Sequence, residues 1–184
     1  EAIGEAAFYG PKIDFITKDS LGRKWQVATI QLDMNMPERF NLVCVDEKGG
    51  SERIVMIHAA IMGSLERFIA PLIEHFAGAF PLWLAPAQAI ILPISEKYEK
   101  YGLKIFDLLK NQNIRVEMNN ANETLGKRIR EAELIKIPYI LVVGDKEENN
   151  KTVNVRHYRR GQIGEIEIQK LLAQIKKEIV DKVI

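Results

Sequence analysis

The second half of the chain alternates between short apolar runs and longer amphipathic segments, and this alternation narrows the possible folds more than any other feature. Apolar runs of about five residues are typical of buried strands, whereas apolar side chains repeating every three or four residues indicate helices. Strands that alternate with helices form a largely parallel sheet, because each helix carries the chain back to the same edge. The predicted strands are 88–93, 114–118, 139–143 and 152–156, and the predicted helices are 96–111, 124–136 and 165 onward.

The first half of the chain is expected to form an antiparallel sheet. Residues 8–33 contain two apolar segments separated by the turn-forming run 19–22, which predicts a β-hairpin. Two further short strands are expected at 42–45 and 54–57, on either side of a polar turn. A hairpin pairs its strands in opposite directions, so this part differs in architecture from the second half.

Prolines mark two places in the first half. Residues 34–41 are expected to be irregular, with Pro37 as the breaker. An amphipathic helix is expected from about Gly63 to Phe76, with Pro71 inside its pattern. Because proline removes a backbone donor and clashes with the preceding turn, this helix is either kinked at Pro71 or begins late.

Residues 77–86 mark a boundary, because they contain one glycine and two prolines. The sequence therefore predicts two domains, 1–83 and 84–184. The first has 8 Lys and Arg against 11 Asp and Glu, and the second has 18 against 14. This mild basic excess is compatible with an RNA partner but lies far below that of non-specific nucleic-acid binders.

The composition excludes several classes of protein. No apolar run approaches the roughly 20 residues that a membrane-spanning helix needs. The single cysteine, Cys44, excludes an internal disulfide and a CxxC metal site, and fits a reducing compartment. The chain begins with Glu1, without methionine or a signal segment, so we expect it to be a piece of a longer protein.

The run 63–68 places Glu66 and Arg67 in the first turn of the expected helix, directly after a strand. An arginine at such a junction can lay its planar guanidinium over a phosphate or an aromatic base. Most exposed charges on helices are only solvated, so a surface Glu–Arg pair is the alternative interpretation.

The stretch from Val55 to Phe68 resembles the third signature motif of class II aminoacyl-tRNA synthetases. Its histidine ahead of Gly-Ser-Leu-Glu-Arg-Phe is similar to the threonyl-tRNA synthetase family in particular. The resemblance covers essentially the whole chain. It implies a truncated, antiparallel class II catalytic core followed by an α/β anticodon-binding domain with a mixed, mostly parallel sheet. Further runs that match in the order of the family are 8–15, 25–26, 31–33, 83–86, 138–139 and 144–147.

This resemblance implies that the complete protein is a threonine–tRNA ligase, which activates threonine with ATP and magnesium and transfers it to its tRNA. Activation needs reactants held in line and charge stabilised around the α-phosphate. Arg67 is the implied catalytic residue, beside the adenine and the phosphates of ATP. The alternative for Tyr9 and Gln26 is a structural role at the hairpin. The residues implied to line the threonine and ATP pocket are Tyr9, Lys12, Gln26, Gln31, Ala60, Ser64 and Arg67.

His58 matches a zinc ligand of the resembled family, where the metal holds the amine and hydroxyl of the substrate. The alternative is an ordinary exposed or hydrogen-bonded histidine at a strand end. A catalytic zinc keeps three protein ligands, and the other two would lie outside this chain. We therefore expect neither zinc nor ATP to be bound by this chain alone. Ala59 replaces an arginine that is usual in the family.

The second domain is similar to the anticodon-binding domain shared by threonyl-, prolyl-, histidyl- and glycyl-tRNA synthetases. RNA loops are read through splayed bases that stack on planar side chains and bond at their edges. For Lys127 and Arg128 the alternative is a solvated helix face. The residues implied to lie near the anticodon are Asn122, Lys127, Arg130, Lys136, Lys146, Glu147 and Arg156.

The implied partners are threonine, ATP and the tRNA for threonine, in a cytoplasmic and homodimeric complete enzyme. The first and second class II motifs are missing here, so this chain alone is expected to be inactive, monomeric and in part apolar on its surface. The alternative function is a non-catalytic tRNA-binding or regulatory module derived from a synthetase. A prolyl- or glycyl-tRNA synthetase is a weaker alternative, opposed by His58 and by Tyr9–Lys12.

Overall fold

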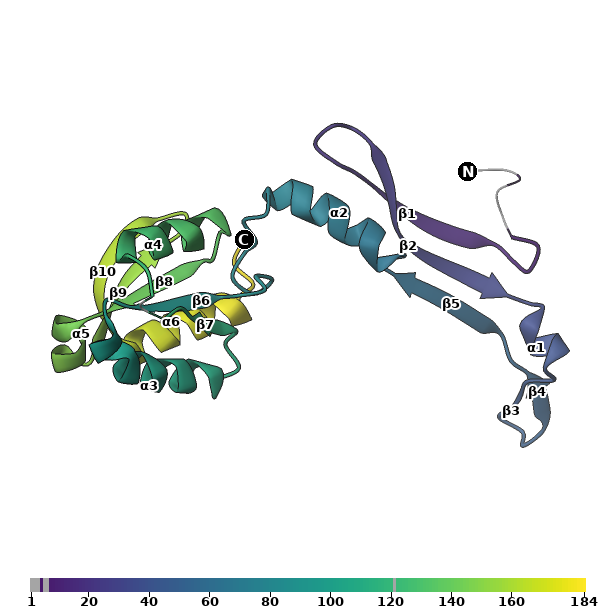
Figure 1. Cartoon of the computed structure of the whole chain (residues 1–184). Helices are drawn as coiled ribbons and strands as arrows, with labels where there is room; N and C mark the ends of the chain where they lie inside the picture. The colour runs from purple at the N-terminus through teal and green to yellow at the C-terminus, as the bar shows by residue number, and fades with distance from the viewer. Residues whose placement is uncertain (1–3, 5–6, 121) are drawn as a thin grey trace. The chain divides into compact units, whose positions relative to one another are not determined.

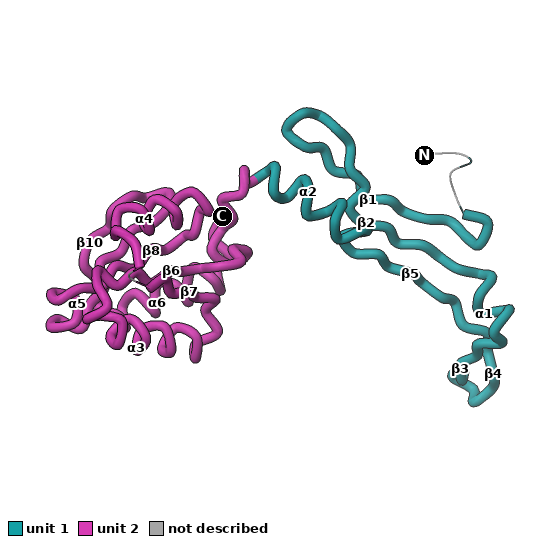
Figure 2. Tube along the Cα trace, in the orientation of Figure 1, with its two compact units in different colours: residues 1–75 teal, residues 76–184 magenta. Residues whose placement is uncertain are grey.

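The computed structural model describes residue 4 and residues 7–120 and 122–184. The chain divides into two compact units, Glu1–His75 and Phe76–Ile184, coloured separately in Figure 2. Within the described ranges, no helix has the length and apolarity needed to cross a membrane. Each unit is described by itself below.

Unit 1 is built on a three-stranded antiparallel sheet in the order β1-β2-β5 (Figure 1). The predicted hairpin is confirmed as β1 and β2. The strand expected at 54–57 is wrong in its bounds, because the strand that returns from the polar turn is Ser51–Arg53 and the next strand, β5, begins only at Met56. The bounds of these strands are β1 (Lys12–Lys18), β2 (Lys24–Asp33) and β5 (Met56–Ile61).

The turn between β1 and β2 is fixed by Asp19. One oxygen of its carboxylate, Oδ1, accepts the backbone N–H groups of Leu21 and Arg23, both at 2.9 Å. The other oxygen, Oδ2, accepts the indole N–H of Trp25 at 2.9 Å. The bond from Trp25 and those from Arg23 and Leu21 lower the pKa of Asp19 to about 2. The carboxylate is therefore charged at neutral pH and closes the turn from its side chain.

The remaining elements of unit 1 correct one expectation and decide another. Residues 34–41 are not irregular throughout, because Pro37 lies in the first turn of a short helix. The first N–H groups of a helix have no partner within it, so the missing N–H of proline costs no hydrogen bond there. The helix α2 continues past Pro71, so the late start is excluded. These elements are α1 (Met36–Arg39), β3 (Val43–Val45), β4 (Ser51–Arg53) and α2 (Leu65–Phe76).

Unit 1 exposes much of its apolar surface. All residues of α2 are described, and none of them is buried. On the edge strand β5, Ile57 is 62% exposed and Ile61 is 78% exposed. A single folded domain seldom leaves a contiguous apolar face uncovered. The exposed face agrees with the expectation of a truncated catalytic core.

Unit 2 contains a five-stranded mixed sheet in the order β10-β9-β8-β6-β7. β6 pairs in parallel with β7 and with β8, whereas β8 with β9 and β9 with β10 pair antiparallel. The predicted mixed α/β fold is confirmed. The strands are β6 (Ala89–Pro93), β7 (Val116–Met118), β8 (Tyr139–Val143), β9 (Thr152–His157) and β10 (Gly161–Glu167).

Helices cover both faces of this sheet (Figure 1). Alternate side chains of a strand point to opposite faces, so Ile91 joins one core and Ile90 the other. Ile105 of α3 and Ile175 of α6 pack in the first core, and Ala132 of α4 packs in the second. The helices are α3 (Glu99–Lys110), preceded by a 3₁₀ turn (Glu96–Tyr98), α4 (Leu125–Leu134), α5 (Asp145–Asn150) and α6 (Ile168–Val180).

The sequence pattern predicts neither α5 nor β10. All six residues of α5 are polar, so it lacks the apolar period of a buried helix. β10 contains Gly161 and Gly164, at φ +70° and +102°, and a bulge interrupts its pairing with β9. Glycine at positive φ and a bulge remove the simple alternation of a strand. Residues 165–167 belong to β10, so the last helix begins at Ile168 rather than at Glu165.

The connector 77–86 packs on the core of unit 2. Leu82 is only 2% exposed, and its carbonyl oxygen accepts the side-chain N–H of Gln88 at 2.8 Å. Arg115 donates to the carbonyl oxygens of Ala85 and Trp83, both at 2.9 Å. The connector is therefore a structural part of this unit, and independent folding of residues 87–184 remains a prediction.

Candidate functional site

Polar residues of β1, β2 and β5 form two rows across one face of the unit 1 sheet. Lys12 lies opposite Gln31, which lies opposite His58. Side chains two residues apart on a strand share a face, so the next row points the same way. That second row consists of Asp14, Thr29 and Ala60. The structure thus brings Lys12, Gln31, His58 and Ala60 together, as expected for the walls of one pocket.

A β-bulge brings Gln26 onto the same face. Phe15 pairs with Ala28 and Ile16 with Gln26, so Val27 is an extra residue in β2. An extra residue re-aims the side chains that follow it. The side-chain amide of Gln26 then donates to Asp14 Oδ1 at 2.8 Å and contacts Thr29 Oγ1 at 2.7 Å.

Asp14 lies at the centre of this network, and sequence reasoning missed both Asp14 and Thr29. Lys12 Nζ lies 2.8 Å from Asp14 Oδ2, and the Thr29 hydroxyl donates to Oδ1 at 2.7 Å. These two contacts, that of Lys12 first, lower the pKa of Asp14 below its ordinary value. The sequence could have indicated Asp14, because residues two apart on a strand lie on the same face and Asp14 is therefore a neighbour of Lys12.

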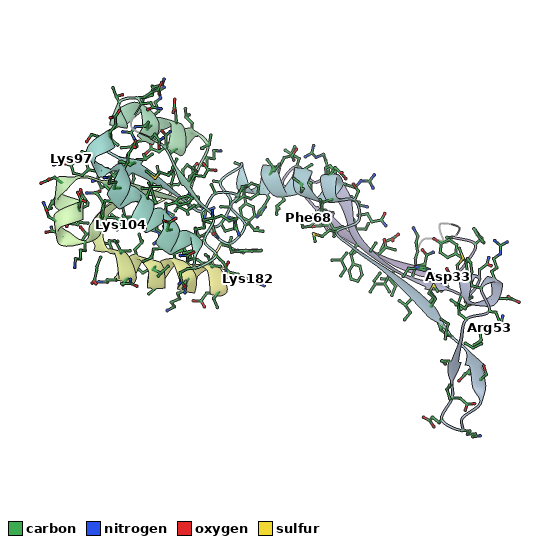
Figure 3. The ribbon with its side chains drawn as sticks, turned by 60° about the horizontal axis from the view of Figure 1, so that its bottom comes forward. Asp33, Arg53, Phe68, Lys97, Lys104 and Lys182 are labelled. Atoms are coloured by element: carbon green, nitrogen blue, oxygen red, sulfur yellow. The ribbon has the colours of Figure 1, made fainter. Side chains whose placement is uncertain are left out.

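Asp33 holds His58 in a fixed orientation. Asp33 is 2% exposed, and its Oδ1 accepts the backbone N–H groups of Asn35 and Met36 at 2.9 Å each. The Met36 bond is the largest of the contacts that lower the pKa of Asp33. The charged carboxylate places Oδ2 at 2.8 Å from His58 Nε2, so that nitrogen carries the proton and Nδ1 keeps its lone pair. Asp33 is labelled in Figure 3.

A hollow of about 240 Å³ lies against this pair. The ring of Tyr9 meets that of His58 edge to face, with centroids 6.4 Å apart. The backbone carbonyl of Tyr9 accepts the N–H of Met34 at 2.9 Å, which fixes Tyr9 beside the end of β2. Tyr9, Asp33 and His58 all line the hollow. The predicted pocket residue Tyr9 therefore lies next to the predicted metal ligand.

The start of α2 lies beside the backbone of β2 at Gln26. A Cβ added to Gly63 would lie 3.7 Å from the carbonyl oxygen of Gln26. Ser64 precedes the helix, and its hydroxyl accepts the backbone N–H of Arg67 at 3.3 Å, which satisfies one free donor of the first turn. The guanidinium of Arg67 is exposed and bonds no other residue that the structure describes. The positive end of the helix and this free cation both favour a negatively charged ligand.

The described residues do not form a complete metal site. In the ranges 7–120 and 122–184, no three His, Cys, Asp or Glu side chains lie together as a metal would require. His58 nevertheless has the features of a single ligand. A metal-binding imidazole commonly donates its other N–H to a carboxylate, as His58 does to Asp33.

In unit 2, Lys146 and Glu147 lie in α5, directly after β8. The Glu147 carboxylate accepts the backbone N–H of Gly144 at 3.0 Å, which ties it to the start of the helix. Lys146 Nζ lies 2.7 Å from Glu165 Oε2. Contacts from Lys146, Thr152 and Asn150, in that order, lower the pKa of Glu165 to about 2. Both predicted residues are thus fixed at the carboxyl end of a central strand.

Asn122, Lys127 and Arg130 lie in or before α4, the helix that follows β7. Asn122 lines a hollow of about 410 Å³ beside this helix. Lys127 pairs with Glu123 and Glu131, and these contacts, that of Glu123 first, raise its pKa. Arg130 is exposed and bonds no other described residue. Since β7 and β8 both run parallel to β6, Asn122 and the residues of α5 share one edge of the sheet.

Arg156 belongs to the face that α4 covers. It lies opposite Ile140 of β8 on one side and opposite Gln162 of β10 on the other. Arg156 Nε contacts Glu133 Oε1 of α4 at 2.6 Å, and its side chain is 39% exposed. Its guanidinium is therefore accessible but partly neutralised.

Arg128 has neither of the roles considered from sequence. It is 1% exposed, so it is not part of a solvated face and cannot reach RNA. Its guanidinium donates to three carbonyl oxygens, those of Pro93 at 2.8 Å, Glu123 at 3.1 Å and Asn119 at 3.3 Å. It joins the ends of β6 and β7 to the start of α4. Five donors in a rigid fork allow one arginine to satisfy several carbonyls, and sequence spacing does not reveal this.

Lys136 lies apart from Lys146 and Glu147. Lys136 precedes β8, whereas Lys146 and Glu147 follow it. The five-residue strand, about 15 Å long, therefore separates Lys136 from the other two residues. Lys136 Nζ donates to the carbonyl oxygen of Ala77. Asn122, Lys127, Lys146 and Glu147 thus lie toward the edge of the sheet where β8 ends. Arg156, which is opposite Ile140 and bonds Glu133, lies with Lys136 toward the edge where β8 begins.

Two family models match the chain, one for each unit. Residues 2–76 match the class II core domain of the tRNA synthetases for glycine, histidine, proline, serine and threonine. Residues 88–178 match the anticodon binding domain. The fold and these matches define a class II aminoacyl-tRNA synthetase with part of its core and its anticodon-binding domain.

Curated relatives narrow the class. Threonine–tRNA ligases of Caldanaerobacter subterraneus and Flavobacterium johnsoniae are 52% and 54% identical over 97% and 96% of this chain. The RNA binding domain of threonyl-tRNA synthetase from Cryptosporidium parvum superposes with a TM-score of 0.85 at 40% identity, over 95% of this chain and 44% of that one. The chain belongs to the threonyl-tRNA synthetase family and corresponds to a C-terminal part of its members. It spans 28% of the length of these two curated relatives.

A more distant structure supports the fold alone. Prolyl-tRNA synthetase from Cryptosporidium parvum superposes with a TM-score of 0.70 at 22% identity, over 99% of this chain and 43% of that one. The family and the fold class predicted from sequence are confirmed. The roles of the individual site residues stay predictions.

Proposed function

We propose that this chain forms the C-terminal part of a threonine–tRNA ligase, with unit 1 contributing to the threonine and ATP pocket and unit 2 reading the anticodon. The observation that carries the proposal is the polar face of β1, β2 and β5, where Lys12, Gln31 and His58 lie side by side. A structural sheet of this size would bury such a face or leave it freely solvated. The first turn of α2, which begins beside the backbone of Gln26, adds an exposed arginine that bonds no other described residue.

The roles follow from the chemistry of each group. Class II synthetases use ATP with magnesium, and Arg67 can stack its guanidinium on adenine while its charge faces the phosphates. Lys12 and Gln31 offer donors to a carboxylate or phosphate oxygen. Ala60 leaves room beside Thr29, because a larger side chain would fill the face.

His58 fits the role of one zinc ligand, since Asp33 holds its Nε2–H and leaves Nδ1 available. The further ligands would come from outside this chain. When bound there, zinc would supply a Lewis acid for the amine and hydroxyl of threonine. With one ligand and one signature motif, this chain alone would not form the adenylate.

The enzyme proposal is tested on the complete protein to which this chain belongs, by exchange of pyrophosphate into ATP in the presence of threonine. We expect exchange, and a loss of at least about a hundredfold in kcat/KM for Arg67→Ala, as for other groups that stabilise transition-state charge. Arg53→Ala, an exposed arginine of unit 1 outside the pocket, is the control and should leave the rate unchanged. A complete protein that binds tRNA without exchange would instead be the non-catalytic module, an alternative that Ala59 favours.

The anticodon proposal is tested on the 184-residue chain with the anticodon arm of the threonine tRNA and with an arm of changed anticodon. A lysine near phosphate adds charge without sequence information, so Lys127→Ala should weaken both RNAs alike. Arg130 and Glu147 can meet base edges, where a lost pair costs about 1–3 kcal/mol, so alanine there should relax discrimination. Equal binding of both arms by the unaltered chain would refute anticodon reading.

A further inference from the structure

A larger hollow, of about 540 Å³, lies in unit 2 at the edge of the sheet where β8 begins. Its lining includes the apolar residues Phe80, Leu82 and Pro138. It also includes four Lys and Arg side chains against the side-chain carboxylates of Glu178 and Asp181, so its side-chain charge is positive in excess. This volume lies within the range of small-molecule sites, which combine an apolar lining with a few polar groups. The residues of α5 proposed to meet RNA lie at the other edge of the sheet.

His157 presents an unsatisfied donor to this hollow. The residue is 7% exposed, and its Nδ1 accepts the backbone N–H groups of Arg159 at 3.1 Å and Arg160 at 3.3 Å. Nδ1 therefore carries a lone pair, and the proton of the neutral ring must be on Nε2. The contact that the structure gives to Nε2 is Arg160 Nη2 at 3.5 Å, and this group is also a donor. Two donors thus meet at this point: Arg160 Nη2 also donates to Glu178, whereas the described residues give His157 Nε2–H no acceptor.

The surroundings keep the ring neutral. Burial, followed by the charge of Arg160, lowers the pKa of His157 to about 4. Glu178 accepts one bond from Arg160 at 3.1 Å and one from the Tyr139 hydroxyl at 2.7 Å. These bonds leave further guanidinium N–H groups of Arg160 available, because arginine has five donors. A buried donor without an acceptor is costly, so an acceptor in this space would be bound favourably.

We propose that this hollow binds a small oxyanion that carries an apolar body, such as an aromatic or aliphatic carboxylate. The oxyanion bonds His157 Nε2–H and Arg160, and the apolar body lies against Phe80 and Leu82. Two converging donors next to a positive excess select an anion over a neutral amide or alcohol. The apolar lining selects a carbon-bearing anion over inorganic phosphate.

Sodium benzoate is the probe, benzamide is its neutral isostere, and inorganic phosphate is the oxyanion without an apolar body. The imidazole ¹H–¹⁵N correlations of the 184-residue chain report on the site, with His58 and His75 as internal references. We expect benzoate to shift the His157 signals saturably, with a dissociation constant on the order of 1 mM for a ligand of this size. Benzamide and phosphate should bind at least about tenfold more weakly, as expected from losing a charge-assisted bond or the apolar contact.

Two variants complete the test. Arg160→Gln removes the charge at an exposed position that does not support the core, and should weaken benzoate about tenfold. Lys100→Gln removes one charge from the exposed surface of α3 and should leave binding unchanged. Equal shifts with benzoate and benzamide, no shift of His157, or unchanged affinity in Arg160→Gln would each overturn the proposal.

Discussion

The buried guanidinium of Arg128 makes a stability prediction that can be worked from its contacts. Arg128→Met keeps the length and apolar volume of the side chain but removes bonds to the carbonyls of Pro93, Asn119 and Glu123. Bonds from a charged donor contribute about 1.5–3 kcal/mol each, and part of this is offset because a charge no longer has to be buried. We expect unit 2 to lose about 3–5 kcal/mol of its free energy of unfolding.

The assay is urea unfolding of the chain, followed by the helical signal, with Lys127→Met as the control. Lys127 is the preceding residue on the same helix, but its ammonium is exposed, so its loss should change stability by less than about 1 kcal/mol. Arg128→Lys should lie between the two, because one ammonium cannot reach three carbonyls arranged around a planar fork. If Arg128→Met and Lys127→Met differ by less than about 1 kcal/mol, the guanidinium does not hold these elements together.

Three further predictions concern unit 2. The pKa of Glu165 is about 2 in the folded chain, below its ordinary 4.5, so the ionised carboxylate stabilises the fold fully above pH 4.5 and this stabilisation is lost as the pH falls toward 2. In Glu165→Gln, the free energy of unfolding from urea melts should therefore depend less on pH between 4.5 and 2. A Cβ at Gly144 would lie 2.7 Å from the terminal methyl of Ile94, whose 43% exposed side chain can move, so Gly144→Ala should destabilise by less than about 1 kcal/mol in thermal melts. Gly126→Ala, in open space within α4, should stabilise by about 0.5–1 kcal/mol in the same melts. Residues 76–184 should melt cooperatively. Residues 87–184 should melt about 10–20 °C lower, because this shorter segment lacks Leu82, which is only 2% exposed in the folded unit. Equal melting temperatures would show that the connector does not stabilise unit 2.

Local patterns predicted the elements that bury an uninterrupted apolar set. Residues 139–143 form β8 with the bounds expected, since four of its five side chains are buried and leave no alternative to a central strand. The predicted helix 96–111 corresponds to a 3₁₀ turn, Glu96–Tyr98, followed by α3, Glu99–Lys110. The sequence pattern did not predict β10 or α5, because they contain few apolar residues or none. Their structure depends on contacts with the rest of the unit rather than on a local periodicity.

The sequence predicted site residues only where they belong to a motif of the resembled family. Resemblance identified Lys12, Gln31 and His58, and the strand register then placed them in one row. Asp14 and Asp33 lie among them, and their importance depends on contacts between residues that are distant in sequence. Arg128 shows the opposite case, because an arginine in a basic run of a helix is indistinguishable in sequence from its exposed neighbours until the fold buries it.

The bulge at Val27 has a consequence for how the length of this strand can vary. Five positions separate Gln26 from Gln31, an odd number that would put them on opposite faces of a regular strand. The bulge absorbs one position and returns Gln26 to the face of Asp14. Deleting Val27 would leave four positions and a regular ladder with the same residues facing the pocket. A chain that lacks Val27 is therefore expected to keep every side chain of the polar face in its direction.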